Sequence, residues 1–362
     1  MSAGTRGTLP AVEPEIVFLT DGGQDAAAIL NRLIAFVDAA RSTLDIAVYD
    51  AHLEEPAATR IVTALDNAKA RGVTVRAVYN DDHPSRQTVV SPQTGPSLLM
   101  RLAAAVPSTA IPGIPDLMHD KYMIRDGDTV LTGSTNWTED AWSRMENVWL
   151  TIPSPDLAAA YSQDFEQLWQ KKHVLGTGTF DDDPATLSYG GQLFSVRALF
   201  SPGRGRSIGH LVARRIAQAT QRIRICSPVI TSGPILSTLA EVLDDNRCDT
   251  MATIDGPQMR QALQQWRTDG RASWKTPLVE RVLASGRVAE KESRPFQAGP
   301  PHDYMHAKVV VCDDMVLTGS YNLSHSGEMN AENVLEIVSP PLADACAAFC
   351  EQVHARYPAA RS

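Results

Sequence analysis

Residues 119–126 read His-Asp-Lys-Tyr-Met-Ile-Arg-Asp, and residues 306–313 read His-Ala-Lys-Val-Val-Val-Cys-Asp. Both stretches follow the pattern HxKxxxxD, and each comes directly after a methionine. Each is followed first by a Gly-Ser-x-Asn segment and then by a Glu-Asn-Val segment; these are residues 133–136 with 146–148, and 319–322 with 332–334. The two histidines stand about half of the 362-residue chain apart. The sequence therefore contains an internal duplication.

The segments around the two motifs also alternate in the same order. Apolar residues recur with helical spacing in some stretches and form short β-branched runs in others. The expected helices are Gln24–Ala40, Ala57–Ala70, Asp156–Lys172, Ile208–Thr220, Ile235–Leu243 and Pro341–Tyr357, and the expected strands are Leu44–Tyr49, Val73–Tyr79, Ile223–Ile230 and Thr250–Ile254. This alternation predicts an α/β fold in which each half is a mostly parallel or mixed sheet flanked by helices.

We expect one repeat at residues 15–173, a linker at 174–195 and a second repeat at 196–358. The linker expectation rests on a stretch rich in Gly, Thr and Asp. Two segments rich in Pro and Gly, Val106–Pro115 and Arg294–Asp303, precede the motifs. We expect both to be irregular loops that form walls of a substrate cleft.

Each motif places a histidine and a lysine one pleat apart on the same face of a strand. The lysine charge should lower the pKa of the histidine and favour its nucleophilic neutral form. The hydroxyl and amide of Gly-Ser-x-Asn are suited to hydrogen-bonding anionic oxygens. Two such units supply one histidine to attack phosphorus and another to protonate the leaving oxygen, which predicts displacement at a phosphodiester.

On these motifs the chain resembles the phospholipase D superfamily. The resemblance implies two pseudo-symmetric halves that share one active site, a phosphohistidine intermediate, and no metal or other cofactor. It implies that the two histidines are nucleophile and general acid, that lysines and asparagines hold the phosphate oxygens, and that two glutamates orient the histidine rings. The corresponding residues are His119, Lys121, Asn136, Glu146, His306, Lys308, Asn322 and Glu332. Ser134 and Ser320 would support the donors. Asp126 and Asp313 lie beyond the strands and are expected to be structural or to support the residues that contact the substrate. Family members resembling this chain favour His119 as the nucleophile, although pseudo-symmetry leaves the two roles interchangeable.

Several other residues have a simpler explanation than a role in the site. We expect His302, His325, His52 and His83 to be solvated loop histidines. Trp137 and Trp142 are expected to pack beneath the site. The Gly203–Arg206 segment lacks the remainder of a phosphate-binding loop. The five cysteines form no paired spacing, and Cys346 and Cys350 are expected to be buried apolar residues.

The substrate class stays open at this level. A phospholipid headgroup, with hydrolysis or transfer to an alcohol, fits the net charge of −9 and the apolar Pro-rich segments. A nucleic acid, cleaved by a metal-independent endonuclease of the same superfamily, fits an acid-free segment with seven arginines; these are Arg197, Arg204, Arg206, Arg214, Arg215, Arg222 and Arg224. A non-catalytic phosphodiester-binding protein is disfavoured by two intact motifs.

The sequence contains no signal-peptide or transmembrane pattern. This favours a cytoplasmic protein with at most peripheral membrane contact, and a mature secreted form stays open. Two motifs in one chain mean that a monomer suffices for a complete site.

Overall fold

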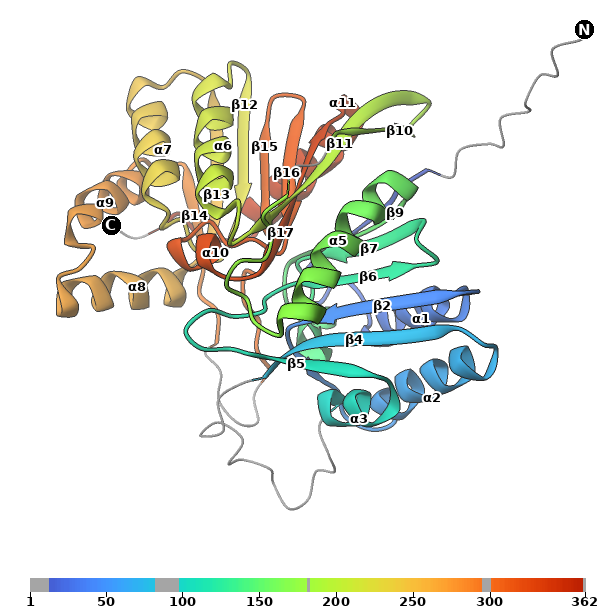
Figure 1. Cartoon of the computed structure of the whole chain (residues 1–362). Helices are drawn as coiled ribbons and strands as arrows, with labels where there is room; N and C mark the ends of the chain where they lie inside the picture. The colour runs from blue at the N-terminus through green and yellow to red at the C-terminus, as the bar shows by residue number, and fades with distance from the viewer. Residues whose placement is uncertain (1–12, 82–97, 181–182, 295–300, 361–362) are drawn as a thin grey trace, which may run out of the picture.

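The computed structural model describes residues 13–81, 98–180, 183–294 and 301–360. Two large sheets carry the two halves of the chain (Figure 1). The first sheet has the strand order β1-β9-β7-β6-β2-β4-β5. Its strands are β1 (Glu15–Leu19), β2 (Thr43–Val48), β4 (Thr74–Asp81), β5 (Ser108–Pro112), β6 (Lys121–Arg125), β7 (Thr129–Gly133) and β9 (Asn147–Pro153).

The second sheet repeats this arrangement, with the order β10-β11-β17-β16-β15-β12-β13-β14. Its strands are β10 (Ala185–Tyr189), β11 (Gln192–Ser201), β12 (Arg222–Cys226), β13 (Asp249–Asp255), β14 (Val288–Lys291), β15 (Val309–Cys312), β16 (Met315–Gly319) and β17 (Glu332–Val338). In each half three strands run parallel, β2-β4-β5 and β12-β13-β14, and the rest pair antiparallel. The predicted α/β fold with two mixed-sheet halves is confirmed.

Helices cover the sheets on their outer faces and fill the space between them (Figure 1). The outer helices are α1 (Ala26–Asp38), α2 (Ala57–Ala70) and α3 (Leu98–Ala105) in the first half, and α6 (Gly205–Gln218), α7 (Gly233–Asp245), α8 (Gly256–Asp269), η1 (Ser273–Lys275) and α9 (Thr276–Ala284) in the second. The inner helices are α5 (Pro155–Lys171) and α11 (Pro340–His354), and two short helices, α4 (Glu139–Ser143) and α10 (His325–Met329), follow the Gly-Ser-x-Asn segments. Local sequence explains the helix starts: α5 has Pro155 at its first position, and the Ser154 side chain accepts from the Leu157 N–H.

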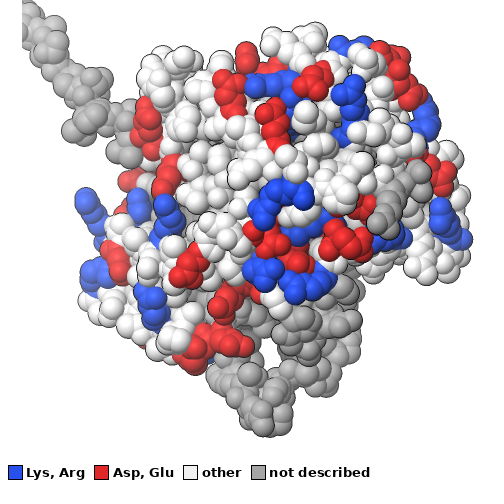
Figure 2. All heavy atoms as spheres, turned by 180° about the vertical axis from the view of Figure 1, so that it is seen from behind, with Lys and Arg blue, Asp and Glu red and all other residues white. Residues whose placement is uncertain are grey.

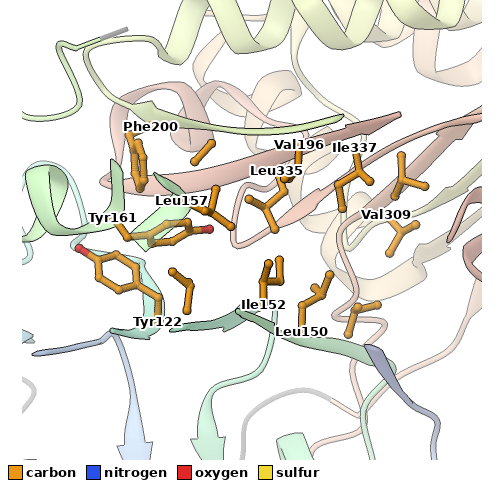
Figure 3. Close-up of a cluster of buried hydrophobic side chains, with 14 of the residues drawn as sticks. Tyr122, Leu150, Ile152, Leu157, Tyr161, Val196, Phe200, Val309, Leu335 and Ile337 are labelled. Carbon is orange, nitrogen blue, oxygen red and sulfur yellow. The ribbon is translucent and has the colours of Figure 1, made fainter. Parts of the chain in front are cut away.

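One hydrophobic core joins the two halves. It lies between the sheets and combines side chains of α5, β6 and β9 with others of β11, β15 and β17 (Figure 3). Strand β7 and helix α11 contribute further side chains to this core. Tyr161, for example, packs edge-on against Tyr122 of its own half and against Phe200 of the other half. Two further cores lie under the outer helices, one in each half. Because the central core is shared, the two halves should stabilise one another.

Two loop predictions are wrong. Val106–Pro115 contains strand β5, which has Pro112 at its end; an edge strand tolerates proline there because it needs no hydrogen bond on its outer side. The range expected as a linker, 174–195, contains β10 and the start of β11, so residues 185–195 form part of the second sheet. Most of the Arg294–Asp303 loop lies outside the described residues, as does His83. Within the described ranges, no helix is long and apolar enough to cross a bilayer.

Candidate active site

The two HxK segments meet where the sheets adjoin, and backbone contacts between the halves fix their positions. The His119 N–H donates to the Ala331 carbonyl at 2.9 Å, and the His306 N–H donates to the Glu146 carbonyl at 3.2 Å. Each half also anchors the methionine before its histidine. Asn80 accepts from the Met118 N–H at 3.0 Å, and Asp255 accepts from the Met305 N–H at 3.0 Å.

Asn80 and Asp255 were not anticipated from the sequence. Both lie at the carboxyl end of the second parallel strand of their half, β4 and β13. The sequence feature that could have identified them is a polar residue directly after a run of apolar strand residues. Ligand sites gather at this edge of α/β sheets. Desolvation raises the pKa of Asp255 to about 6, against the N–H and hydroxyl donors around it.

His119 is held by a carboxyl group from the other half. Its Nδ1 lies 2.7 Å from Oε2 of Glu332, which is fully buried at the start of β17. Burial raises the pKa of Glu332 to about 8, and Lys121 opposes this rise. Burial, followed by the charges of Lys121 and Lys308, holds the pKa of His119 well below its usual value. Burial therefore disfavours the protonated ring of His119 and the ionised carboxyl group of Glu332 when either is charged without the other. The Glu332 carboxyl lies where it can balance positive charge that develops on the ring.

His306 has an amide partner in place of a carboxylate. Its Nδ1 lies 3.0 Å from Oδ1 of Asn147, and the Ser134 hydroxyl donates to the same oxygen at 2.7 Å. Burial first, then Lys308 and Lys121, also lower the pKa of His306 well below its usual value. An amide oxygen can fix the ring tautomer, but it takes up no charge.

The structure does not place Glu146 against a histidine, contrary to the prediction. The cause is a one-residue difference in strand register between the halves. In the two Glu-Asn-Val segments, Val148 is equivalent to Val334. Gly319 pairs with Val334, whereas the equivalent Gly133 pairs with Trp149, one residue after Val148. Asn147 therefore occupies the position of Glu332, because a one-residue shift reverses which side chains face the site.

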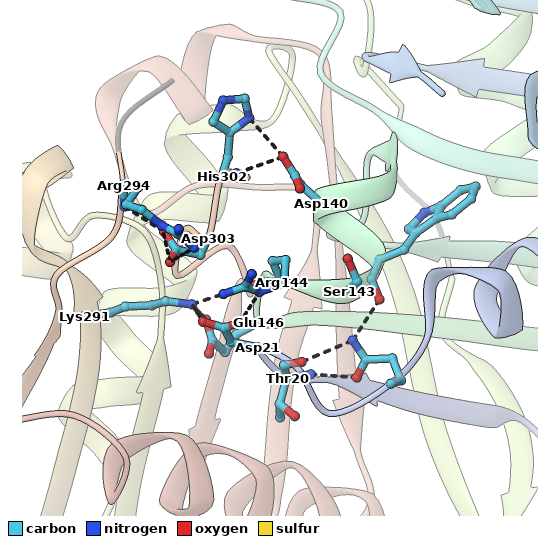
Figure 4. A network of polar contacts seen from close by, with 12 residues as sticks. Thr20, Asp21, Asp140, Ser143, Arg144, Glu146, Lys291, Arg294, His302 and Asp303 are labelled. Atoms are coloured by element: carbon cyan, nitrogen blue, oxygen red, sulfur yellow. Dashed lines mark hydrogen bonds and ion pairs between the residues drawn. The ribbon is translucent and has the colours of Figure 1, made fainter. Parts of the chain in front are cut away.

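The Glu146 carboxyl instead belongs to a buried polar network between the halves (Figure 4). Lys291 of β14 donates to it at 2.8 Å and also lies 3.3 Å from Asp21. The Tyr357 hydroxyl donates to the other oxygen of Glu146. Arg144 completes the group with a 2.7 Å contact from its Nε to Asp21. Glu146 thus joins the halves next to His306 and does not orient the ring.

Lys121 and Lys308 occupy equivalent places beside the histidines. Each is 3% exposed, and each ammonium group donates to the backbone carbonyl of the histidine two residues earlier, at 2.5 and 2.6 Å. Desolvation lowers the pKa of Lys121 to about 8 and that of Lys308 well below its usual value. Each lysine affects the pKa of both histidines, so the four side chains form one site.

Tyr49 belongs to this group and was not anticipated. It follows β2, and its ring lies 4.5 Å from the His119 ring and 4.7 Å from the Lys121 ammonium, measured to ring centroids. A tyrosine at the end of a central parallel strand was its only signal in the sequence. Such a cation–π contact helps to hold a buried ammonium group that has few acceptors.

The Gly-Ser-x-Asn segments form the loops beside the histidines. The Ser134 hydroxyl accepts from the Val148 N–H at 2.9 Å, and the Ser320 hydroxyl accepts from the Asn333 N–H at 3.0 Å. Asn136 and Asn322 follow two residues later and are half-buried. Within the described part of the chain, the amide oxygen of each is buried without a hydrogen-bond partner. The same unsatisfied group in both motifs marks these amides as candidates for ligand contact.

Asp126 and Asp313 lie at the far ends of their strands and act on turns. Both have φ of 54°. Asp126 accepts from the backbone N–H groups of Arg41, Ser42 and Thr43. Asp313 accepts in the same way from residues 220–222. Although partial burial acts in the opposite direction, these donors lower the pKa of both carboxyl groups.

The remaining candidates have structural surroundings. Trp137 and Trp142 are buried in the core of the first half, as predicted. A Cβ on Gly203 or Gly205 would collide with the backbone of Gly178 or Glu328, so close packing explains these glycines. The histidines contact carboxylates: His52 pairs with Asp50, His302 with Asp140 and His325 with Glu328. Cys346 and Cys350 are buried free thiols, as predicted.

Four of the seven arginines are engaged in ion pairs away from the histidines. Arg197 and Arg215 both contact Glu336, at 2.6 and 2.7 Å. Arg222 pairs with Asp344, and Arg224 pairs with Asp249 and Glu351. On the face shown in Figure 2, basic and acidic side chains are interspersed, and no continuous basic stripe crosses it.

In the part of the chain that the structure describes, no three His, Cys, Asp or Glu side chains converge in a way that could hold a metal ion.

Comparison with known proteins agrees with the duplication of the chain. The family described as "Cardiolipin synthase, PLD-like domain" matches residues 33–169 and 212–353, one match for each half. The chain belongs to the phospholipase D superfamily.

Relatives of this superfamily match parts of the chain. A mitochondrial cardiolipin hydrolase of Xenopus tropicalis is 33% identical over 142 residues, which are 39% of this chain and 61% of that protein. A phospholipase D of Rickettsia conorii is 36% identical over 106 residues, which are 29% of this chain and 48% of that protein. The chain thus spans about three fifths or less of the length of these two relatives.

Among solved structures, the phosphatidylserine synthase of Haemophilus influenzae has the same fold over nearly the whole chain. Its TM-score is 0.68 at 15% identity, and the match covers 96% of this chain and 87% of that one. The polyphosphate kinase of Porphyromonas gingivalis matches with a TM-score of 0.57 at 13% identity, over 94% of this chain and 50% of that one. At these identities the likeness concerns the fold alone.

Proposed function

We propose that this protein is a metal-independent phosphodiesterase of phospholipase D type that hydrolyses the headgroup phosphodiester of a phospholipid. One observation carries the proposal: two histidines from opposite halves face one site between two buried lysines, and of these two only His119 is paired with a carboxyl group. The side chains of the chain itself supply the positive charge that a phosphoryl-transfer transition state requires.

In the first step, Nε2 of His119 attacks phosphorus, and the bond from phosphorus to the headgroup oxygen breaks. Glu332 accepts from Nδ1–H and so stabilises the positive charge that develops on the ring. His306 donates its proton to the departing headgroup oxygen. Burial and then the lysine charges lower the pKa of His306 in the free site. A bound anionic phosphate offsets the lysine charges, which favours the protonated form that this step needs.

In the second step, His306 takes a proton from water, and the resulting oxygen attacks phosphorus as the bond to His119 breaks. The products are phosphatidic acid and the original enzyme. An alcohol in place of water would give a new phosphodiester by the same route. Lys121, Lys308, Asn136 and Asn322 would hold the non-bridging oxygens throughout, and one chain carries every residue required.

The choice of a lipid rests on two supports. The two relatives described above are named mitochondrial cardiolipin hydrolase and phospholipase D. In addition, four arginines of the segment that favoured a nucleic acid are engaged in ion pairs with acidic side chains. A groove that tracks a nucleic-acid backbone needs uncompensated positive charge.

The test compares substrates in EDTA. Wild type and His119→Ala are incubated with vesicles of phosphatidylcholine or cardiolipin, and separately with single-stranded and double-stranded DNA. His210→Ala, which changes an exposed histidine of α6, is the matched control. We expect phosphatidic acid or headgroup release by wild type and the control, and none by His119→Ala. DNA cleavage without lipid turnover would replace the lipid with a nucleic acid, and strict dependence on added Mg²⁺ would contradict the mechanism.

A further inference from the structure

Asp120 stands between the two site residues His119 and Lys121, yet the mechanism does not use it. Its side chain is completely buried. The counterpart in the second motif is Ala307. A buried carboxyl group in one motif and a methyl group in the other is a costly difference unless the carboxyl has a partner.

That partner is Asn333, the residue after Glu332. The Asn333 Nδ2 donates to Asp120 Oδ1 at 2.7 Å, across the junction of the halves. Two consecutive residues of the first half, His119 and Asp120, therefore contact two consecutive residues of the second half, Glu332 and Asn333, each at 2.7 Å.

Asn333 is fully hydrogen-bonded in this position. Its Oδ1 accepts from the Thr132 hydroxyl at 3.0 Å and from the Tyr161 hydroxyl at 3.1 Å. Its backbone N–H donates to the Ser320 hydroxyl at 3.0 Å, and Ser320 is also a hydrogen-bond partner of the Glu332 carboxyl. The contacts form a closed circuit of Asp120, Asn333, Ser320, Glu332 and His119.

The second histidine lacks such a circuit. In the register of the strands, Val148 occupies the position of Asn333, and Ala307 that of Asp120. His306 therefore has the Asn147 contact but no polar contact behind it from these two positions.

We propose that Asp120 is a positioning residue, which acts through Asn333 and Ser320 to hold the Glu332 carboxyl against the His119 ring. The expected effect on kcat rests on the function proposed above. The expected effect on the position of Glu332 against the His119 ring does not depend on that function. Loss of the carboxyl would leave the Asn333 amide one acceptor short and let Glu332 move relative to the ring. Because small displacements of a positioned group reduce the rate steeply, kcat should fall while substrate binding changes little.

Three variants test the proposal. Asp120→Ala removes the acceptor with the residue found at the equivalent position of the other motif. Asp120→Asn keeps an oxygen that can accept from Asn333. Asp164→Asn is the matched control, since Asp164 is another fully buried acid of the same core, hydrogen-bonded to Tyr122 and outside the circuit.

The readout that needs no substrate is proton NMR of protein labelled with ¹⁵N-histidine. The resonance of His119 Nδ1–H, assigned by its loss in His119→Gln, should lie far downfield in wild type and in Asp164→Asn. It should move upfield or exchange away in Asp120→Ala and return in Asp120→Asn. In parallel, Asp120→Ala should lower kcat about tenfold or more with KM nearly unchanged, and Asp120→Asn should recover most of the rate.

A folded Asp120→Ala protein with an unchanged His119 resonance and unchanged kcat would overturn the proposal and leave Asp120 with a role in stability alone. If Asp120→Ala does not fold, Asn333→Asp takes its place, because it replaces the hydrogen-bond donor with a second carboxylate. The His119 resonance of Asn333→Asp is then compared with that of Asp164→Asn. An unchanged His119 resonance in Asn333→Asp would also overturn the proposal. If no phosphodiester is cleaved by wild type, the NMR result still tests the geometry, and only the proposed function fails.

Discussion

His119 and Glu332 are separated by 213 positions in the chain, and their side chains meet at 2.7 Å at the junction of the two halves. The equivalent contact of the other half joins His306 to the amide of Asn147. A duplicated sequence thus yields two histidines with different partners, a carboxyl group for one and an amide for the other. Of these two histidines, only His119 lies against a carboxyl group, which supports the proposal that His119 is the nucleophile.

Glu332→Gln should lower kcat at least 100-fold, because a glutamine cannot balance the charge that develops on His119. The fold should persist, since glutamine has nearly the same size and still accepts a hydrogen bond. Steady-state kinetics and thermal unfolding measure the two effects. Glu336→Gln is the control, as Glu336 pairs with Arg197 and Arg215. Equal losses of activity in both variants would indicate a general effect of losing buried charge.

Asn147→Glu should raise the pKa of His306 above its wild-type value, because an ionised carboxyl group would then lie beside this ring. The sign follows from the charge: a nearby anion stabilises the protonated ring, so protonation occurs at higher pH. NMR titration of the His306 ring measures the shift, with wild type as the reference. A His306 pKa equal to that of wild type would show that residue 147 does not control the ring.

The affinity for inorganic phosphate should decline as the pH rises through about 8, because Lys121 loses its charge at its lowered pKa. A lysine is charged below its pKa, so its attraction for the phosphate is present at lower pH and lost above this value. Calorimetric titration with inorganic phosphate at pH values on both sides of 8 measures the decline. In Lys121→Gln the affinity should be low throughout, without this decline. The same decline in Lys121→Gln would assign it to another group.

Asp126→Ala and Asp313→Ala should each lower the free energy of unfolding by about 1–2 kcal/mol, because each removes several hydrogen bonds to a charged acceptor. Activity per folded molecule should be retained, since both residues act on turns at the far ends of the strands. Urea unfolding measures the loss. Asparagine should be the milder replacement, because it tolerates the positive φ of these positions. A variant of normal stability with no activity would place the aspartates in the chemistry.

The fold was largely predictable from sequence because the duplication repeats both motifs and periodicity. Helix α2 has the predicted bounds, Ala57–Ala70, and α1, α5, α6, α7 and α11 differ by a few residues at their ends. Strand β5 was missed because prolines near an edge strand resemble those of a loop. Strands β10 and β11 were missed because their hairpin lies in a segment whose composition is typical of a linker.

The candidate site was predictable as far as the motifs extend. His119, Lys121, His306 and Lys308 come together as the pattern indicated. Glu146 differs because identical Glu-Asn-Val segments enter the sheets in registers one residue apart, and nothing in those letters reveals the register. Asn80, Asp255 and Asp120 act through contacts between distant segments, which a single sequence does not display.

The most direct test of the account is to locate the covalent intermediate. A phosphatidyl ester with p-nitrophenol as leaving group needs little protonation, so His306→Ala should form the intermediate and release it slowly. Rapid mixing followed by mass spectrometry of peptides at alkaline pH, where phosphohistidine survives, should find the adduct on His119 in His306→Ala and none in His119→Ala. An adduct on His306 in His119→Ala, with none on His119 in His306→Ala, would contradict the assignment, and no adduct in either variant would contradict the covalent mechanism.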